Sequence, residues 1–167
     1  MKKTALAPPD CLHLQAAQGW LELDNHIEAN EELQKIEAKL RAHPDVLELR
    51  WQIYAKAGNW EGCLDIAAAI TECAPDRLFG WLQLSYALHE LNRTREAWEN
   101  LLPVSLRFPT EPMVFYNLAC YACQLGKMAD STTLLKKACE LDDADRVRIM
   151  ALDDPDLEAL WRRIGEL

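Results

Sequence analysis

The chain has 167 residues, with 27 acidic and 18 basic side chains and a formal charge of −9. Its length suits one domain, and the shortage of Lys and Arg argues against nucleic acid or an anionic membrane surface as a partner, because clustered basic side chains bind phosphate groups. We expect no membrane-spanning helix and no secretory signal, and hence a cytoplasmic protein whose six cysteines are reduced thiols.

Residues 1–9 are expected to form a tail, and residues 10–43 a degenerate helix pair that turns at Asp24-Asn25. Asp10 is a candidate N-cap for the first helix. Because Pro44 falls three residues later than the repeat described below requires, we expect the second helix to be about one turn longer. Apolar residues recur at helical spacing on either side of the turn: Leu14, Ala17, Trp20 and Leu21, then Ile27, Leu33, Ile36 and Leu40.

Three consecutive windows, 44–77, 78–111 and 112–145, align when the sequence is shifted against itself by 34 residues. Several aligned positions hold residues of one kind, although others depart, as where Arg50 aligns with Leu84 and Leu118. An early large apolar position reads Leu47, Trp81 and Phe115, and a later position reads Gly58, Asn92 and Gly126. Gly and Asn tolerate positive φ values, so each window is predicted to contain two helices joined by a turn at that position.

The pattern resembles the tetratricopeptide repeat (TPR), whose signature is W-x2-L-G-x2-Y, then A-x3-F and then P. The best match runs from Phe115-Tyr116-Asn117-Leu118-Ala119 through Gly126 to Ala138. The resemblance implies an all-α fold, a right-handed α-solenoid of antiparallel helix pairs. It also implies that the first helix of each pair lines a concave groove.

Residues 146–167 follow the last repeat and are expected to cap it, since a stack of repeats must cover its final apolar face. Asp154-Pro155 is a typical helix start, and apolar residues then share one face: Leu157, Leu160, Trp161 and Ile164. Pro103 lies inside the second helix of window 78–111, where it predicts a kink.

Cys120 and Cys123 share a helix face at a spacing that zinc and redox sites use. Zinc prefers four protein ligands in structural sites, and His89, which in-register stacking would place near Cys123, brings the set to three at most. Small thiols also suit close helix packing. We therefore predict no catalytic residue, no cofactor and no metal site, with a thiol redox or metal-binding protein as one alternative.

The resemblance places candidate binding residues on the first helices of the second and third windows: Phe79, Leu82, Gln83, Tyr86, His89, Met113, Tyr116 and Asn117. The apolar and aromatic members predict a patch for a protein or peptide partner with an apolar or aromatic anchor, although they could instead seal against the terminal helix. The predicted function is a non-catalytic adaptor, scaffold or assembly factor. A secretion-type chaperone, similar in size, acidity and repeat number, is the other alternative.

Overall fold

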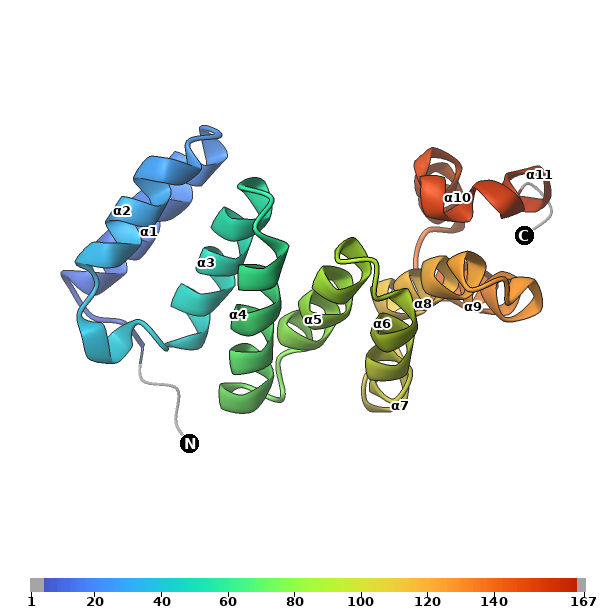
Figure 1. Ribbon diagram of the computed structural model, residues 1–167, viewed down its shortest axis with the longest axis horizontal. Coiled ribbons are helices and arrows are strands. Elements are labelled where there is room, and N and C mark those ends of the chain that lie inside the picture. Colours follow the sequence, from blue (N-terminus) through green and yellow to red (C-terminus); the bar gives the residue numbers. More distant parts are fainter. Residues whose placement is uncertain (1–4, 165–167) are drawn as a thin grey trace. The chain divides into compact units, whose positions relative to one another are not determined.

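The computed structural model describes residues 5–164, and in that range every regular element is a helix. The all-α prediction is therefore confirmed. The chain divides into two compact units, Met1–Gly80 and Trp81–Leu167. Figure 1 shows the helices of each unit following one another as antiparallel pairs.

The first unit contains two helix pairs, each joined by a short turn. The core between them is built from Ala17, Ala29, Leu33, Ile36, Val46, Leu49 and Ile53, all buried. Burial of these apolar surfaces is what holds the two pairs together. The elements are α1 (Asp10–Glu22), α2 (His26–Lys35), the short 3-10 helix η1 (Ala38–Leu40), α3 (Pro44–Lys56) and α4 (Trp60–Cys73).

The expected lengthening of the second helix is wrong. α2 ends at Lys35 because Ile36 adopts an extended conformation, with ψ at 137°, and the additional residues before Pro44 form η1 instead. Arg41 holds this connection in place, since its guanidinium donates to the carbonyl oxygens of Ile36 and Gln34 at 2.9 and 2.5 Å. The additional residues therefore form a hydrogen-bonded connection rather than another helical turn.

The prediction that Asp10 caps the first helix is also wrong. Asp10 is the first residue of α1, and Pro9 occupies the N-cap position without a side-chain hydrogen bond. The Asp10 carboxylate instead accepts a hydrogen bond of 2.7 Å from the backbone N–H of Glu37. The carboxylate thus ties the start of α1 to the connection after α2.

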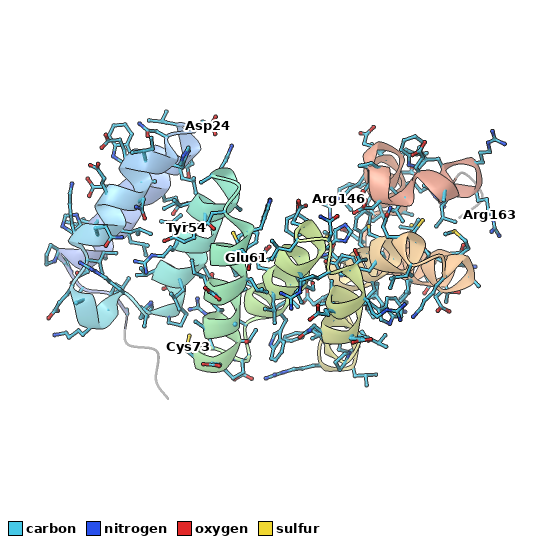
Figure 2. All side chains as sticks on the ribbon, viewed as in Figure 1. Asp24, Tyr54, Glu61, Cys73, Arg146 and Arg163 are labelled. Atoms are coloured by element: carbon cyan, nitrogen blue, oxygen red, sulfur yellow. The ribbon has the colours of Figure 1, made fainter. Side chains whose placement is uncertain are left out.

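The 34-residue spacing is visible in the helix starts, since α3, α5 and α8 begin at Pro44, Leu78 and Pro112. The predicted turn residues Gly58, Asn92 and Gly126 have φ values of 68°, 59° and 74°, and Asp24 has 61° in the corresponding turn of the first pair; Figure 2 labels Asp24. These are left-handed values, which favour Gly, Asn and Asp. The residues that mark the repeat in the sequence are therefore the ones the turns require.

The second unit contains the rest of α5 (Leu78–Glu90), followed by α6 (Thr94–Leu101), α7 (Val104–Arg107), α8 (Pro112–Gln124) and α9 (Met128–Leu141). Pro103 separates α6 from α7, as the predicted kink requires, because proline lacks the backbone N–H that a continuous helix needs. α8 and α9 form an antiparallel pair that packs along its length.

The chain after α9 differs from the predicted single capping helix. It forms α10 (Ala144–Asp153), the 3-10 helix η2 (Pro155–Leu160) and the short helix α11 (Trp161–Ile164). Asp154 does cap the start of η2, accepting from the backbone N–H of Asp156. Of the predicted apolar face, three side chains are buried, Leu157, Leu160 and Ile164, whereas Trp161 is 37% exposed. The placement of Trp161 on the buried face is therefore wrong; its indole N–H reaches back to the carbonyl oxygen of Ala151 at 3.0 Å.

Two glycines in helices give a matched test of packing in the first unit. A Cβ on Gly80 would lie 2.8 Å from Cγ2 of Ile70 and 3.1 Å from the backbone nitrogen of Thr71, whereas a Cβ on Gly19 would meet nothing within 4 Å. Gly80→Ala should lower the free energy of unfolding by about 1–3 kcal/mol through overpacking. Gly19→Ala should raise it by about 0.5–1 kcal/mol, because alanine favours the helix. Urea unfolding of both variants tests this, and equal effects of the same sign would contradict the packing.

Candidate functional site

The predicted binding residues lie on two helices, α5 and α8. Seven of them are in the second unit: Leu82, Gln83, Tyr86 and His89 on α5, and Met113, Tyr116 and Asn117 on α8. Phe79 is in the first unit, where its ring forms a T-shaped pair with that of Trp51 at a centroid distance of 5.9 Å. We call the side of α5 and α8 that carries Tyr86, His89, Tyr116 and Cys120 the inner face of the second unit.

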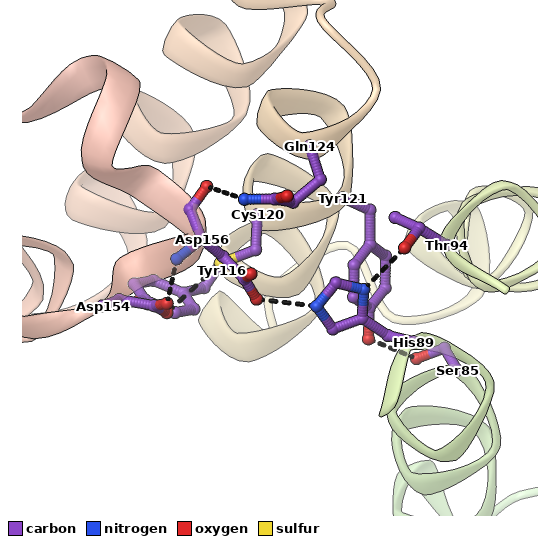
Figure 3. A network of polar contacts seen from close by, with 9 residues as sticks. All are labelled: Ser85, His89, Thr94, Tyr116, Cys120, Tyr121, Gln124, Asp154 and Asp156. Atoms are coloured by element: carbon purple, nitrogen blue, oxygen red, sulfur yellow. Dashed lines mark hydrogen bonds and ion pairs between the residues drawn. The ribbon is translucent and has the colours of Figure 1, made fainter. Parts of the chain in front are cut away.

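The chain's own C-terminal segment covers part of this inner face (Figure 3). We call residues 154–164 the strap. Its first carboxylate, that of Asp154, accepts hydrogen bonds at Oδ2 from the Tyr116 hydroxyl at 2.9 Å and from the Cys120 thiol at 3.4 Å. Tyr116 and Cys120 are one helical turn apart on α8, so both donors point to the same oxygen.

The second carboxylate of the strap, that of Asp156, reaches α5. Its Oδ2 lies 2.7 Å from Nε2 of His89, and the other ring nitrogen of His89 lies 2.9 Å from the Thr94 hydroxyl. Because a carboxylate only accepts, the hydrogen of the short contact belongs to Nε2 of His89. The side-chain amide of Gln124 also donates to the backbone oxygen of Asp156 at 3.0 Å, so α8 contacts the backbone of the strap as well as its side chains.

Beneath the strap, α5 and α8 are joined by a buried aromatic contact. The Tyr121 hydroxyl lies 3.2 Å from the Ser85 hydroxyl, and the Tyr121 ring packs against the His89 ring with centroids 5.1 Å apart. The His89 ring is thereby held by packing against Tyr121 and by the contact of its Nδ1 atom with the Thr94 hydroxyl. Its orientation toward Asp156 is fixed by contacts that do not involve the strap.

The predicted aromatic patch is therefore divided. Tyr116 is only 4% exposed, whereas Tyr86 and Met113 are 37% and 40% exposed. The Tyr116 side chain therefore packs against the C-terminal segment, which was the alternative to an open binding patch. Burial raises the pKa of Tyr86 to about 12, as do its hydrogen bond to Glu90 and the nearby carboxylates. The open part of the inner face is thus both apolar and acidic.

The two cysteines of the predicted pair are buried in α8. Burial raises the pKa of both thiols, and the adjacent Asp154 raises that of Cys120 further. His89, expected near Cys123, contacts Tyr121 and Asp156. Within residues 5–164 no group of three or more His, Cys, Asp or Glu side chains is arranged to hold a metal ion.

Sequence reasoning missed Asp154 and Asp156 as site residues. The sequence pattern favours solvated or helix-capping carboxylates at both positions, and Asp154 does cap η2. What the sequence does contain is an Asp-Pro-Asp segment, 154–156, together with possible donors on two repeat helices, Tyr116 and His89. No feature of the sequence places the Asp-Pro-Asp segment next to that Tyr and that His.

The first unit has a separate, open cleft between α1 and α3. Charged groups at its edge are paired within the chain, since Nζ of Lys56 lies 2.6 Å from a carboxylate oxygen of Asp24 and the Gln18 amide donates to Glu22 at 3.3 Å. The cleft is lined by Gln18, Leu21, Glu22, Trp51, Gln52, Ala55 and Lys56.

No family model and no curated protein sequence matches the chain. Solved structures do. TTC0263, a thermophilic TPR protein of Thermus thermophilus, superposes with a TM-score of 0.74 at 17% identity, over 93% of this chain and 83% of that one. The chain has the tetratricopeptide-repeat fold. MamA 41-end from Desulfovibrio magneticus RS-1 gives a TM-score of 0.73 at 16% identity, covering 98% and 97% of the two chains. MamA MSR-1 gives 0.67 at 20% identity, over 80% and 76%.

At these identities the likeness concerns the fold alone. Among residues 5–164, no helix is long and apolar enough to cross a membrane.

The buried thiols should react slowly in the folded protein. Cys73, near the end of α4 (Figure 2), is exposed, whereas Cys120 and Cys123 are buried with raised pKa values. Since the thiolate is the reactive form, iodoacetamide at pH 8 should modify Cys73 at least about tenfold faster than either cysteine of α8. Peptide mass spectrometry over a time course measures this. Equal rates would contradict the burial of the pair.

Buried Cys63 predicts a loss of stability at alkaline pH. Burial raises the pKa of the Cys63 thiol from 9.0 to about 11. The contribution of this thiol to the free energy of unfolding is therefore complete below pH 9 and is lost as the pH rises to about 11. Between pH 9 and pH 11 the Cys63 thiol is ionised only in the unfolded chain, so the free energy of unfolding should fall by up to about 1.4 kcal/mol per pH unit. Urea unfolding from pH 8 to 11 should show a shallower decline for Cys63→Ala and an unchanged one for Cys73→Ala. Identical slopes in all three chains would contradict the prediction.

Proposed function

We propose that this chain is a non-catalytic protein- or peptide-binding module that acts as an adaptor, scaffold or assembly factor. The observation that supports this most directly is the strap itself. The inner face of the second unit holds a peptide segment through side chains on α5 and α8, with hydrogen bonds to two carboxylates and to one backbone oxygen. The same face therefore has the chemistry needed to hold another peptide.

Tyr86 and Met113 extend this face beyond the strap. Both are more than one third exposed, and they lie on the same two helices that hold Asp154 and Asp156. Tyrosine is a good interface anchor because its ring offers a large contact area and its hydroxyl offers a hydrogen bond. We propose that a partner places apolar or aromatic side chains here, beside the strap. Leu82, Gln83 and Asn117 are partly exposed on the same helices and are the proposed neighbours of this contact.

The other predicted functions receive less support. A redox or metal role requires thiolates, and burial disfavours the thiolate form of both Cys120 and Cys123. No observation favours a secretion-type chaperone over a general adaptor. The net charge of −9 continues to argue against nucleic acid, and we propose a cytoplasmic location.

Peptide display against the full-length chain tests this function. Selected peptides should be measured by calorimetry against wild type, Tyr86→Ala and Met113→Ala. If the two side chains are anchors, each substitution should weaken binding by about 1–3 kcal/mol, or about 5- to 150-fold, with unchanged helical content by circular dichroism.

Lys136→Ala is the matched control, because Lys136 is exposed on α9 and lies outside the inner face; it should leave the affinity unchanged. The proposal would be overturned if no peptide is selected, or if Tyr86→Ala and Met113→Ala affect the selected peptides no more than this control does.

A further inference from the structure

We infer that the strap occupies, within one chain, a site that also accepts an external acidic peptide of the same form, Asp-Pro-Asp-Leu-x-x-Leu. This inference rests on the proposed function, that the inner face binds peptides, and adds the strap's own position as a second place where a peptide binds. The form is that of residues 154–160, whose two carboxylates and two leucines are all used in contacts or buried.

The first position is selective for a carboxylate. Oδ2 of Asp154 receives two donors, the Tyr116 hydroxyl and the Cys120 thiol, while Oδ1 accepts from the backbone N–H of Asp156 at 3.0 Å. An ionised carboxylate has enough acceptor capacity for three donors on two oxygens, whereas an Asn side chain would turn an N–H₂ group toward one of them. Substitution of Asp by Asn here therefore removes the charge that strengthens these hydrogen bonds, and it forces the Tyr116 hydroxyl to turn and accept if the Asn oxygen keeps the Asp156 N–H.

The second position is also built for an acceptor. The His89 ring is fixed by Thr94 and Tyr121, so Nε2 is directed at Asp156 by the protein and not by the strap. A preorganised donor of this kind binds a carboxylate without first losing side-chain freedom. Gln124 adds a contact to the backbone oxygen of Asp156, which any peptide in this position would supply.

The apolar positions follow directly. Leu157 and Leu160 are 0% and 1% exposed, and η2 packs against both α8 and α10. Burial of leucine side chains is favourable because it removes apolar surface from water. The two leucines give the site an apolar requirement that an Asp-Pro-Asp sequence alone would not meet.

Several features allow the strap to exchange. It consists of a six-residue 3-10 helix and a four-residue α-helix, and segments this short are not stable on their own. The carboxylates of Asp154 and Asp156 also act on Tyr86 together with that of Glu90, and like charges repel. The strap is thus held by its contacts with the inner face, and a peptide that makes the same contacts competes with it.

The experiment uses the full-length chain and a fluorescent peptide with the sequence of residues 152–164. A strap attached to its own site acts at a high effective concentration, on the order of millimolar, so wild type should bind the peptide weakly. Asp154→Asn together with Asp156→Asn should accelerate hydrogen exchange in residues 154–164 and tighten peptide binding, measured by anisotropy, at least about tenfold.

Three controls define the site. The double variant Asp153→Asn with Glu158→Gln also removes two negative charges, but at exposed positions. Hydrogen exchange in the strap and peptide affinity should both stay as in wild type. Adding Tyr116→Phe to the Asp154/Asp156 double variant, which keeps the ring, should abolish most of the gain in affinity. A peptide with Asn in place of both Asp154 and Asp156 should not compete.

The inference would be overturned if the double variant exchanges no faster in the strap than wild type, if the strap is released without a gain in peptide affinity, or if the Asn-containing peptide competes equally. The two proposals fail separately. If display-selected peptides depend on Tyr86 and Met113 but the acidic peptide does not bind, only the present inference is wrong. If neither binds, the proposed function is wrong as well.

Discussion

Two carboxylates on the strap, those of Asp154 and Asp156, meet donors on α8 and α5 that are fixed by the helices themselves. The contacts to Tyr116 and His89 measure 2.9 and 2.7 Å. These two hydrogen bonds hold the strap over Tyr116, which is buried, and position the leucines of η2. The part of the inner face that the strap does not cover stays open. A partly buried carboxylate needs such donors, because its charge is costly to remove from water without them. The shape of the candidate site therefore depends on this pairing.

The 34-residue repeat and its turns could be predicted because their causes are local. Gly58, Asn92 and Gly126 adopt positive φ values that few other residues tolerate, and Pro103 interrupts a helix because it lacks a backbone donor. Such effects act within a few residues and leave a periodic trace in the sequence. The same reasoning failed where a polar side chain had two possible partners. Asp10 bonds to the backbone of Glu37, 27 residues away, instead of capping its own helix.

The site was predicted less completely than the fold. The resemblance placed seven candidate residues on α5 and α8 of the second unit, but burial of Tyr116 follows from the path of the chain after α9. That path includes α10, which no repeat position predicted, and it returns residues 154–156 to helices that lie more than 30 residues earlier. Solvated and partly buried aspartates look alike in a single sequence. The distinction comes only from the partners that the fold supplies.

A double-mutant cycle on Tyr116 and Asp154 tests the central pairing most directly. The free energies of unfolding of wild type, Tyr116→Phe, Asp154→Asn and the double variant would be measured by urea titration at neutral pH. The structure predicts a coupling energy of about 1 kcal/mol or more, since both substitutions act on the same part-buried hydrogen bond: Phe removes its donor, and Asn removes the charge of its acceptor. Additive effects, with a coupling energy near zero, would contradict the claim that this contact holds the strap on the inner face.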